Sequence, residues 1–423
     1  MLSPPASAAG TASGPSIHEV VRGSLVETVF QPLADLGSGI VVGYEALSRG
    51  PQGSELESPE ALFDAARLAG LSGALDWICL AGALRAALAA NVHPSCAIFI
   101  NVEPSSLRRP PPAWLTELIE IAQSKLTVVF EITERAIADA PAELLGATAR
   151  IRGEGMLIAV DDVGAHPGSL ALLPFLGPEL VKLDIDVTQT AGLWAMARTA
   201  TAVHAYAEWS GACVVAEGIE TSEHRESALA LGADLGQGWL FGRPGALPAD
   251  VVLPATRRLT AARRPEPGRL QTPFDLLSAR RPILRGDKGL LLRMSQGIEE
   301  QARTEGDSVV LLSAFQDSRF FGPRVRRRYR RLGEHCALVG ALGVGLATTP
   351  EPGVRGASLA LTDPLCGEWA VCLVGPYITA AFAGKDLGDS GPDDERRFDF
   401  VISHDRDLVI AATHSMMTRL AVD

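Results

Sequence analysis

LIAVDD, residues 157–162, is a run of four apolar residues that ends in two adjacent carboxylates. An uninterrupted apolar run of this length is typical of a strand that is buried on both faces of a parallel sheet. Two ionised Asp side chains at the end of such a strand repel each other, and their removal from water is costly unless a cation lies between them. Asp161 and Asp162 therefore predict a buried strand that ends at a cation site.

Five further apolar runs with polar residues at or near their ends lie along the same part of the chain. They are GIVVGYEAL (39–47), CAIFIN (96–101), LTVVFE (126–131), ELVKLD (179–184) and CVVAE (213–217). Helical patterns separate the runs, as in residues 59–90, where apolar residues recur at helical spacing. This alternation over about 220 residues predicts a TIM-like (β/α) barrel. DLGSG, residues 35–39, is typical of a turn between two strands, so we expect the barrel to open with an antiparallel pair.

The 423 residues suffice for a large barrel and a smaller partner domain. Residues 1–17 are rich in Ala, Ser, Pro and Gly, and we expect them to be disordered. We expect the barrel over 18–248, a polar and basic linker over 249–272, and a smaller α/β domain with an antiparallel sheet over 273–423.

One segment of this second domain, RVRRRYRRLGEHCALVGALG (324–343), is rich in arginine and predicts a helix. Its apolar residues recur at steps of three and four, which indicates a buried stripe: Val325, Tyr329, Leu332, Cys336 and Val339. The arginines would then lie on a solvated face rather than bind nucleic acid. An acidic partner of this helix could equally be the barrel domain or a nucleotide.

The composition limits the partners and the compartment. A formal net charge of −12 argues against a dedicated nucleic-acid binder, whose phosphate contacts need a basic surface. The six cysteines are scattered without a CxxC pair, which predicts buried free thiols in a reducing compartment. The longest apolar stretch, around residues 74–90, carries Asp76 and Arg85, so we expect no membrane insertion. No signal peptide is recognisable, and we expect a cytoplasmic protein.

The polar residues at the strand ends are the candidates for chemistry: Glu45, Asn101, Glu131, Asp161, Asp162, Lys182, Asp184 and Glu217. In a parallel barrel all of these ends emerge on one face, where active sites lie. A single acid there could simply cap a helix or lie solvated on a loop, but acids at consecutive strand ends point to a shared site. Oxygen ligands select hard divalent cations such as Mg²⁺ or Mn²⁺, and adjacent Asp residues suit a two-metal site for phosphoester hydrolysis.

Seven motifs, in this order, resemble those of the bacterial EAL-domain phosphodiesterases. They are YEALSRG (44–50), FINVEPSSL (99–107), FEITERA (130–136), DDVG (161–164), VKLD (181–184), AEGIET (216–221) and GQGWLFGRP (236–244). The resemblance implies a TIM-like barrel that hydrolyses cyclic di-GMP to linear pGpG with two Mg²⁺ or Mn²⁺ ions. The second region more loosely resembles the DICT sensory domain, which implies regulation of the barrel by an unknown ligand or protein.

The resemblance also implies residue roles. The metal ligands would be Glu45, Asn101, Glu131, Asp161 and Asp162, with Asp161 shared between the two ions. Lys182 would contact the attacking water, and Glu217 would orient or deprotonate it. The substrate-binding residues would be Leu47, Arg49, Asp184 and Gln237. The family implies a homodimer through the barrel.

The loop after the Asp pair departs from the family, because DDVGAHPGSL (161–170) stands where DDFGTGYSSL is usual. Val163 replaces a Phe, and His166 with Pro167 replaces a Gly-Tyr pair, which changes the mobility of a loop that couples the metal site to dimerisation in the family. We group Glu134 with these regulatory residues. His166 could be a catalytic base or a solvated loop residue. A catalytically inactive cyclic di-GMP receptor and a barrel enzyme for another substrate remain alternatives.

Overall fold

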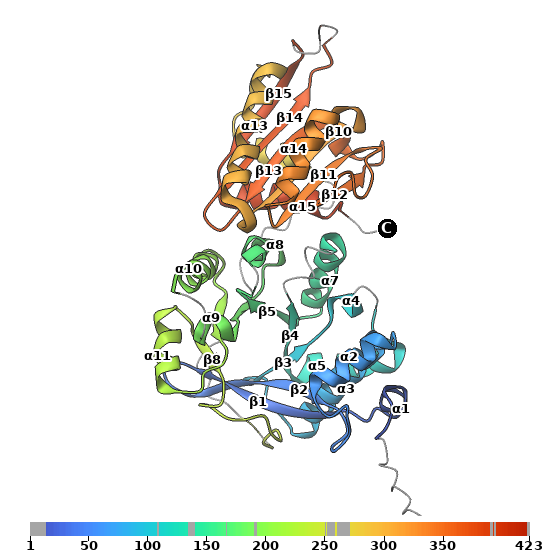
Figure 1. Ribbon diagram of the computed structural model, residues 1–423, viewed down its shortest axis with the longest axis vertical. Coiled ribbons are helices and arrows are strands. Elements are labelled where there is room, and N and C mark those ends of the chain that lie inside the picture. The colour runs from blue at the N-terminus through green and yellow to red at the C-terminus, as the bar shows by residue number, and fades with distance from the viewer. Residues whose placement is uncertain are drawn as a thin grey trace, which may run out of the picture.

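The computed structural model describes two units, a closed eight-stranded barrel and a seven-stranded sheet (Figure 1). The described residues are 14–107, 110–133, 140–165, 167–189, 193–249, 251, 259, 271–389, 392 and 395–420. The predicted TIM-like barrel followed by a smaller α/β domain is therefore confirmed. The boundaries proposed between segments stay predictions; most of the expected disordered segment and of the linker lies outside the described residues.

The barrel strands follow one another around the cylinder in chain order. They are β1 (Glu27–Asp35), β2 (Val41–Arg49), β3 (Ala97–Asn101), β4 (Thr127–Thr133), β5 (Leu157–Val163), β6 (Leu180–Leu183), β7 (Cys213–Ala216) and β8 (Leu235–Gln237). β1 pairs antiparallel with β2 and with β8, whereas the pairs from β2 to β8 are parallel. The expected antiparallel opening is thus present, and the carboxyl ends of seven strands meet at one face.

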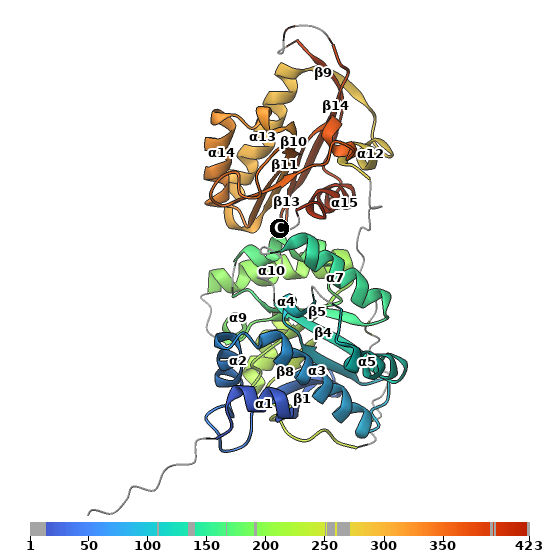
Figure 2. The same cartoon turned by 90° about the vertical axis from the view of Figure 1, so that its right-hand side faces the viewer.

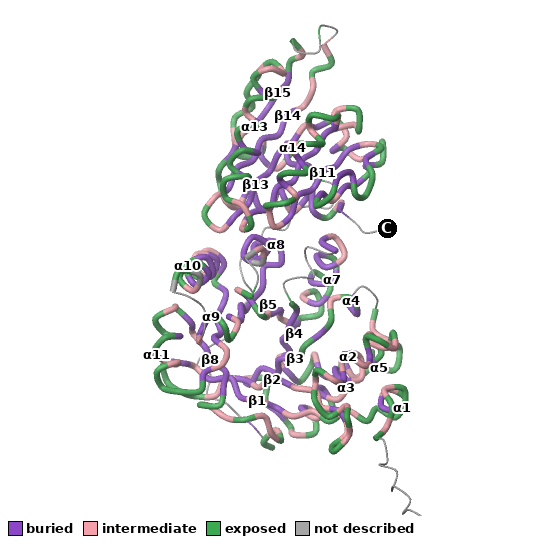
Figure 3. Tube along the Cα trace, viewed as in Figure 1, coloured by how far each residue is buried: buried purple, intermediate pink, exposed green. Residues whose placement is uncertain are grey.

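Helices surround this cylinder. Those described are α1 (Ile17–Gly23), α2 (Pro59–Leu68), α3 (Ser72–Ala89), α4 (Pro104–Leu107), α5 (Ala113–Lys125), α7 (Pro141–Gly153), η1 (Pro167–Ala171), α8 (Leu173–Leu176), α9 (Ile185–Gln189), α10 (Leu193–Ser210) and α11 (Ser222–Ala230). In Figure 3 the strands are mostly buried, as the continuous apolar runs predicted. Glu131, Asp161 and Lys182 lie in the carboxyl-terminal halves of their strands, whereas Glu45 lies in the middle of β2.

The helix α3 is long and apolar enough to cross a membrane by length and composition. Here it packs on the barrel and buries eight residues, among them Leu75, Leu80 and Leu84. The helix therefore has an ordinary place in the barrel wall. The cytoplasmic location stays a prediction.

The second unit is a mixed sheet in the order β12-β11-β10-β13-β14-β15-β9. Its strands are β9 (Leu284–Asp287), β10 (Val310–Asp317), β11 (Leu338–Val344), β12 (Val354–Ser358), β13 (Glu368–Val374), β14 (Thr379–Asp386) and β15 (Arg397–Ser403). Four pairs are antiparallel, but β11 runs parallel to both β10 and β12. The expectation of an antiparallel sheet was incomplete because a helix crosses over between β10 and β11, which returns the chain in the same direction.

Helices cover both faces of this sheet (Figure 2). They are α12 (Pro273–Ser278), α13 (Lys288–Glu305), η2 (Gly306–Ser308), η3 (Ser318–Phe320), α14 (Pro323–Gly333), η4 (Pro364–Gly367) and α15 (Arg406–Met417). The predicted helix over 324–343 was wrong in its second half, because α14 ends at Gly333 and Val339 lies in β11. An apolar run such as ALVGALG fits a buried strand as well as a helix, so spacing alone misassigned it. All six cysteines are free, although Cys336 and Cys366 are only half-buried.

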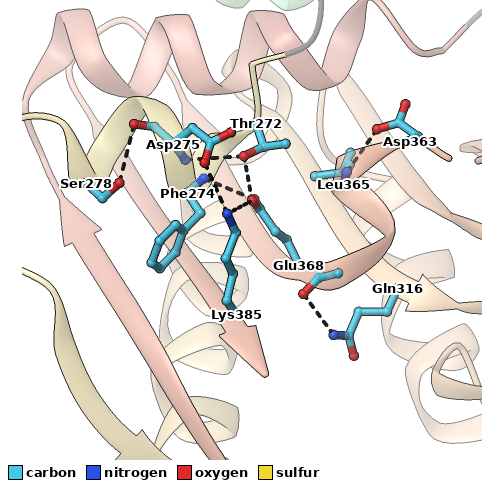
Figure 4. Close-up of polar contacts among 10 residues, drawn as sticks. Thr272, Phe274, Asp275, Ser278, Gln316, Asp363, Leu365, Glu368 and Lys385 are labelled. Atoms are coloured by element: carbon cyan, nitrogen blue, oxygen red, sulfur yellow. Dashed lines mark hydrogen bonds and ion pairs between the residues drawn. The ribbon is translucent and has the colours of Figure 1, made fainter. Parts of the chain in front are cut away.

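A buried carboxylate fixes the start of this second unit (Figure 4). Glu368 is fully buried on β13 and accepts hydrogen bonds from the Thr272 hydroxyl at 2.5 Å and from the Phe274 backbone N–H at 3.0 Å. The Thr272 side chain also caps α12 by accepting from the Asp275 N–H. The Lys385 ammonium lies 3.5 Å from Glu368 and balances its charge. These contacts hold α12 against the sheet.

The sheet unit rests on the barrel through α15, which faces α8 (Figure 1), and through η2, which packs on η1. The Trp209 indole N–H donates to Asp407 at 2.8 Å, and the Arg406 guanidinium lies over the Trp209 ring. A second polar contact joins Arg198 to Asp307 at 3.6 Å. One continuous cluster of buried apolar side chains includes members of both units.

Candidate active site

The predicted polar side chains meet at the carboxyl ends of the barrel strands, around one ammonium group. Lys182 on β6 is fully buried. Its Nζ lies 2.7 Å from Glu217, 2.9 Å from Glu131, 3.2 Å from Asp161 and 3.5 Å from Glu45. Four carboxylates therefore share one cation, and only Glu217 and Asp161 among them retain appreciable contact with solvent.

Glu45 is held in place by two amides, one from the adjacent strand β3 and one from β8. Asn101 Nδ2 donates to Glu45 Oε1 at 2.7 Å, and Gln237 Nε2 donates to Glu45 Oε2 at 2.5 Å. Gln237 also contacts Gln31 Oε1 at 3.2 Å. Sequence reasoning missed Gln31, although the β1–β2 register places it directly opposite Glu45 and the predicted hairpin could have revealed it.

The adjacent Asp161 and Asp162 share a site because the strand is distorted there. Successive side chains of a regular strand point to opposite faces, which would separate the two acids. Asp162 has a φ of 58°, in the left-handed region that Asp tolerates, and the β5–β6 register shifts between Val160 and Val163. The carboxylate oxygens of Asp161, Asp162 and Glu217 consequently lie within 4.8 Å of one another.

The electrostatics of the cluster show too few cations for its acids. Burial raises the pKa of Glu217 to about 8, against the attraction of Lys182. Burial, with repulsion from Glu45, raises the pKa of Glu131 well above its usual range. The pKa of Glu45 is lowered, because Lys182 and hydrogen bonds outweigh the effect of burial. Although burial alone would lower the pKa of Lys182, the surrounding carboxylates raise it well above its usual value, so the ammonium stays charged.

The donor set fits divalent cations. The five carboxylates Glu45, Glu131, Asp161, Asp162 and Glu217, with the Lys182 ammonium, leave a formal charge of −4, which two divalent ions would cancel. Glu131 Oε2 is buried and has no hydrogen-bond partner among the described residues. Among the described residues, the acids and the amide of this cluster offer oxygen ligands, which Mg²⁺ and Mn²⁺ prefer.

Other predicted residues lie outside this cluster. Leu47 and Arg49 lie farther along β2 and are half-buried, and Arg49 donates to the Ser48 carbonyl at 2.9 Å. Asp184 accepts from the Asp186 N–H at 2.7 Å at the start of α9. Within the part of the chain that the structure describes, neither Arg49 nor Asp184 bonds to the carboxylates. Their contact with substrate stays a prediction.

The loop after the Asp pair leads away from the cluster toward the second unit. Val163 is fully buried at the end of β5, and Pro167 begins η1. His166 and Glu134 lie outside the described residues. Gly168 of η1 lies so close to the second unit that a Cβ at this position would be 3.3 Å from the Cβ of Ala337. The loop whose sequence differs from the usual DDFGTGYSSL therefore leads into a segment that contacts the second unit.

Two family models match the chain. The EAL domain matches residues 17–244, which is more than half of the chain. A second model, described as a sensory domain in diguanylate cyclases and two-component systems (DICT), matches residues 275–385.

Known proteins similar to the chain match its first half. The probable cyclic di-GMP phosphodiesterase PdeB of Escherichia coli K12 is 33% identical over 248 residues, which cover 53% of this chain and 43% of that protein. The cyclic di-GMP phosphodiesterase RocR of Pseudomonas aeruginosa is 32% identical over 54% of this chain and 61% of its own length. BlrP1 of Klebsiella pneumoniae, solved as a manganese and cyclic di-GMP complex, is 29% identical over 52% of this chain and 56% of that chain, with a TM-score of 0.47. The chain thus matches only about half the length of these proteins.

Proposed function

Because the chain belongs to the EAL-domain family, we propose that its barrel is a metal-dependent phosphodiesterase that hydrolyses cyclic di-GMP to linear pGpG. The observation that carries the proposal is the surplus of buried carboxylates around Lys182 at the carboxyl ends of the barrel strands. The names of PdeB and RocR support the substrate class.

We assign the metal ligands to Glu45, Asn101, Glu131, Asp161 and Asp162. In support, Glu45, Glu131 and Asp161 all approach Lys182, and Asp162 lies beside Asp161. When bound, two Mg²⁺ or Mn²⁺ ions would supply positive charge for the attacking water and for the leaving oxygen. Asn101 also donates to Glu45, so its amide fixes the direction of that carboxylate.

Lys182 and Glu217 have the remaining roles. An ammonium among four carboxylates stays protonated, so Lys182 is suited to hold and polarise a water molecule rather than to remove its proton. The Glu217 side chain is 22% exposed, the most accessible of the four acids around Lys182, and is placed to orient the water. Leu47, Arg49, Asp184 and Gln237 would contact substrate, with Gln237 also positioning Glu45.

We further propose that the second unit controls this reaction through η1. Only four residues separate Asp162 from the start of η1, and η1 packs on η2. A change in how the second unit rests on the barrel would therefore be transmitted to the segment that follows the metal ligands. A homodimer through the barrel remains part of the proposal.

The direct test is incubation of the full chain with cyclic di-GMP and either Mg²⁺ or Mn²⁺, followed by chromatography of the products. Release of pGpG is expected. Tight binding of cyclic di-GMP without product under both metals would reject the enzyme. That outcome would favour a receptor, the alternative that the altered loop keeps open.

Control by the second unit is tested with Trp209→Phe, which removes the N–H that Asp407 accepts and keeps the ring. Turnover should change by up to about fivefold, the equivalent of one hydrogen bond. Trp194→Phe is the matched control, because Trp194 lies on the same helix and is 85% exposed. Equal turnover in both variants would remove the case for control through this interface.

A further inference from the structure

A groove between α13 and α14 of the second unit carries a surplus of positive charge. The two helices lie side by side on one face of the sheet (Figure 1). The groove has a volume of about 590 Å³ and is lined by five arginines and only two acids, Glu299 and Glu300. This concentration of arginine is notable in a chain whose net charge is −12.

The arginines of α14 divide into two groups, which the sequence could not separate. Arg326 and Arg330, on the side of α14 away from the groove, both pair with Glu351. In the groove, Arg328 pairs with Glu299. The remaining three have no hydrogen-bond or ion-pair partner among the residues that the structure describes: Arg324, Arg327 and Arg331. Spaced at three and four residues, they form one stripe along the groove.

An aromatic pocket adjoins the groove. Its volume is about 140 Å³, close to that of a cavity that accepts a single benzene ring. The aromatic walls are Phe315, Phe320, Trp369 and Phe398, of which Phe320 and Trp369 are only half-buried. The wall also contains Gln316, which has a φ of 60° at an irregularity of β10. A strained residue beside a pocket is typical of a ligand site.

The groove and the pocket share a wall, because Glu299 and Arg328 line both. This wall is fixed: the Tyr329 hydroxyl lies 3.0 Å from Glu299 Oε1 and 2.5 Å from Ser313 Oγ, and Arg328 pairs with the same carboxylate. Glu299 is buried and already has its partners, so it adds little negative charge to either space. The two spaces therefore form one site, with the aromatic rings in the pocket beside Lys288 and Arg396, and the arginines without partners in the groove.

We propose that this site binds a nucleoside polyphosphate, with the base in the aromatic pocket and the phosphates along Arg324, Arg327 and Arg331. Bases stack on aromatic rings, and guanidinium groups match phosphate oxygens in geometry and charge. Three arginines without partners suit more than one phosphate. The inference rests on the second unit alone and holds whether or not the barrel is catalytic.

Calorimetric titration of the full chain tests the proposal in EDTA, where phosphates cannot bind the barrel through metal ions. UTP and CTP, whose bases have a single ring, are compared with uridine and cytidine, which lack phosphates, and with inorganic triphosphate, which lacks a base. At least one nucleotide should bind at least about tenfold more tightly than either fragment. Triphosphate that binds as tightly as both nucleotides, or no binding of either nucleotide, would overturn the proposal.

Variants locate the ligand. Arg327→Gln should weaken nucleotide binding about tenfold, since it removes one charged phosphate contact. Arg326→Gln is the matched control, because the neighbouring arginine lies outside the groove and Arg330 still pairs with Glu351. Phe320→Leu should weaken the binding of the nucleotide but not that of inorganic triphosphate, because the variant loses the ring on which the base stacks. Equal effects of Arg327→Gln and Arg326→Gln would show that the nucleotide binds elsewhere.

Discussion

The barrel and the sheet unit each contain a cluster of charged residues, with opposite imbalances. The barrel cluster is largely buried, whereas the arginines without partners in the sheet unit are exposed. In the barrel, four carboxylates surround Lys182 and Asp162 lies beside them. In the sheet unit, one buried carboxylate, Glu299, is matched by its neighbours while arginines remain without partners. One region lacks cations and the other lacks anions.

The difference indicates what each region binds. In the barrel, buried charge is costly unless it is paired, so the surplus of carboxylates points to a ligand of opposite sign. The arginines of the groove are exposed and stay solvated without partners, so their surplus indicates a surface that attracts anions. The acids of the barrel cluster lie close together around one ammonium, which suits small ions. The arginine groove is open and its side chains are long, which suits a larger anion.

Removal of metal ions should have the largest effect on the barrel. EDTA is expected to abolish hydrolysis of cyclic di-GMP, and added Mg²⁺ or Mn²⁺ to restore it, because the carboxylates cannot stabilise a phosphoester transition state by themselves. Ca²⁺ should inhibit, since its larger and looser coordination shell fits a compact site poorly. Product formation is the measurement. Undiminished hydrolysis after thorough chelation would contradict the proposal that the barrel carboxylates bind catalytic metal ions.

Loss of a single ligand should have the next largest effect. Glu45→Ala is expected to lower turnover at least about a hundredfold, or about 2.7 kcal/mol in the barrier, because the metal's charge stabilisation weakens. The fold should persist, since one acid fewer relieves repulsion around Lys182. The control is Glu117→Ala, an exposed acid on α5. Near-normal turnover of Glu45→Ala with intact structure would show that Glu45 is not a ligand.

Asp76 shows how a buried acid behaves without a cation, because it has no cation partner among the described residues. Burial raises its pKa to about 7, against the hydrogen bond from the Glu103 N–H. The pKa of an Asp side chain in the unfolded chain is about 3.9. Because the folded protein binds this proton more tightly, the contribution of Asp76 to stability is fully present below pH 4 and is lost as the pH rises through 7.

Relative to Asp76→Asn, the wild-type unfolding free energy should therefore fall by about 2 kcal/mol between pH 5 and pH 7. Urea denaturation at each pH measures this difference. The exposed Asp64, which pairs with Arg67, supplies the control Asp64→Asn, for which the difference should stay flat. A flat profile for Asp76→Asn as well would show that Asp76 is ionised in the fold.

Much of the barrel could be predicted because its constraints are local to each strand. LIAVDD and its companion runs must be buried on both faces, and their polar ends must then meet at one face of the barrel. Lys182 and its carboxylates followed directly from this argument. The distortion at Asp162 could not be predicted in this way, because a pattern of apolar residues does not reveal that one Asp adopts a positive φ.

The sheet unit was harder to predict. The ALVGALG run, which became β11, fits a helix by spacing, and only its parallel neighbours in space decide otherwise. The division of the α14 arginines depends on Glu351 and Glu299, which come from other elements. The contact between η1 and η2 likewise joins residues far apart in the chain. Such tertiary partners are absent from the local patterns on which sequence reasoning depends.

The central claim is that the carboxylate surplus of the barrel is a divalent cation site, and the most direct test is to count the ions. Equilibrium dialysis of the full chain against Mn²⁺ should give two tightly bound ions per chain, with at least one lost or weakened at least about tenfold in Asp161→Asn. Asp64→Asn should bind as the wild type does. A wild-type chain that binds no more Mn²⁺ than Asp161→Asn would contradict the claim.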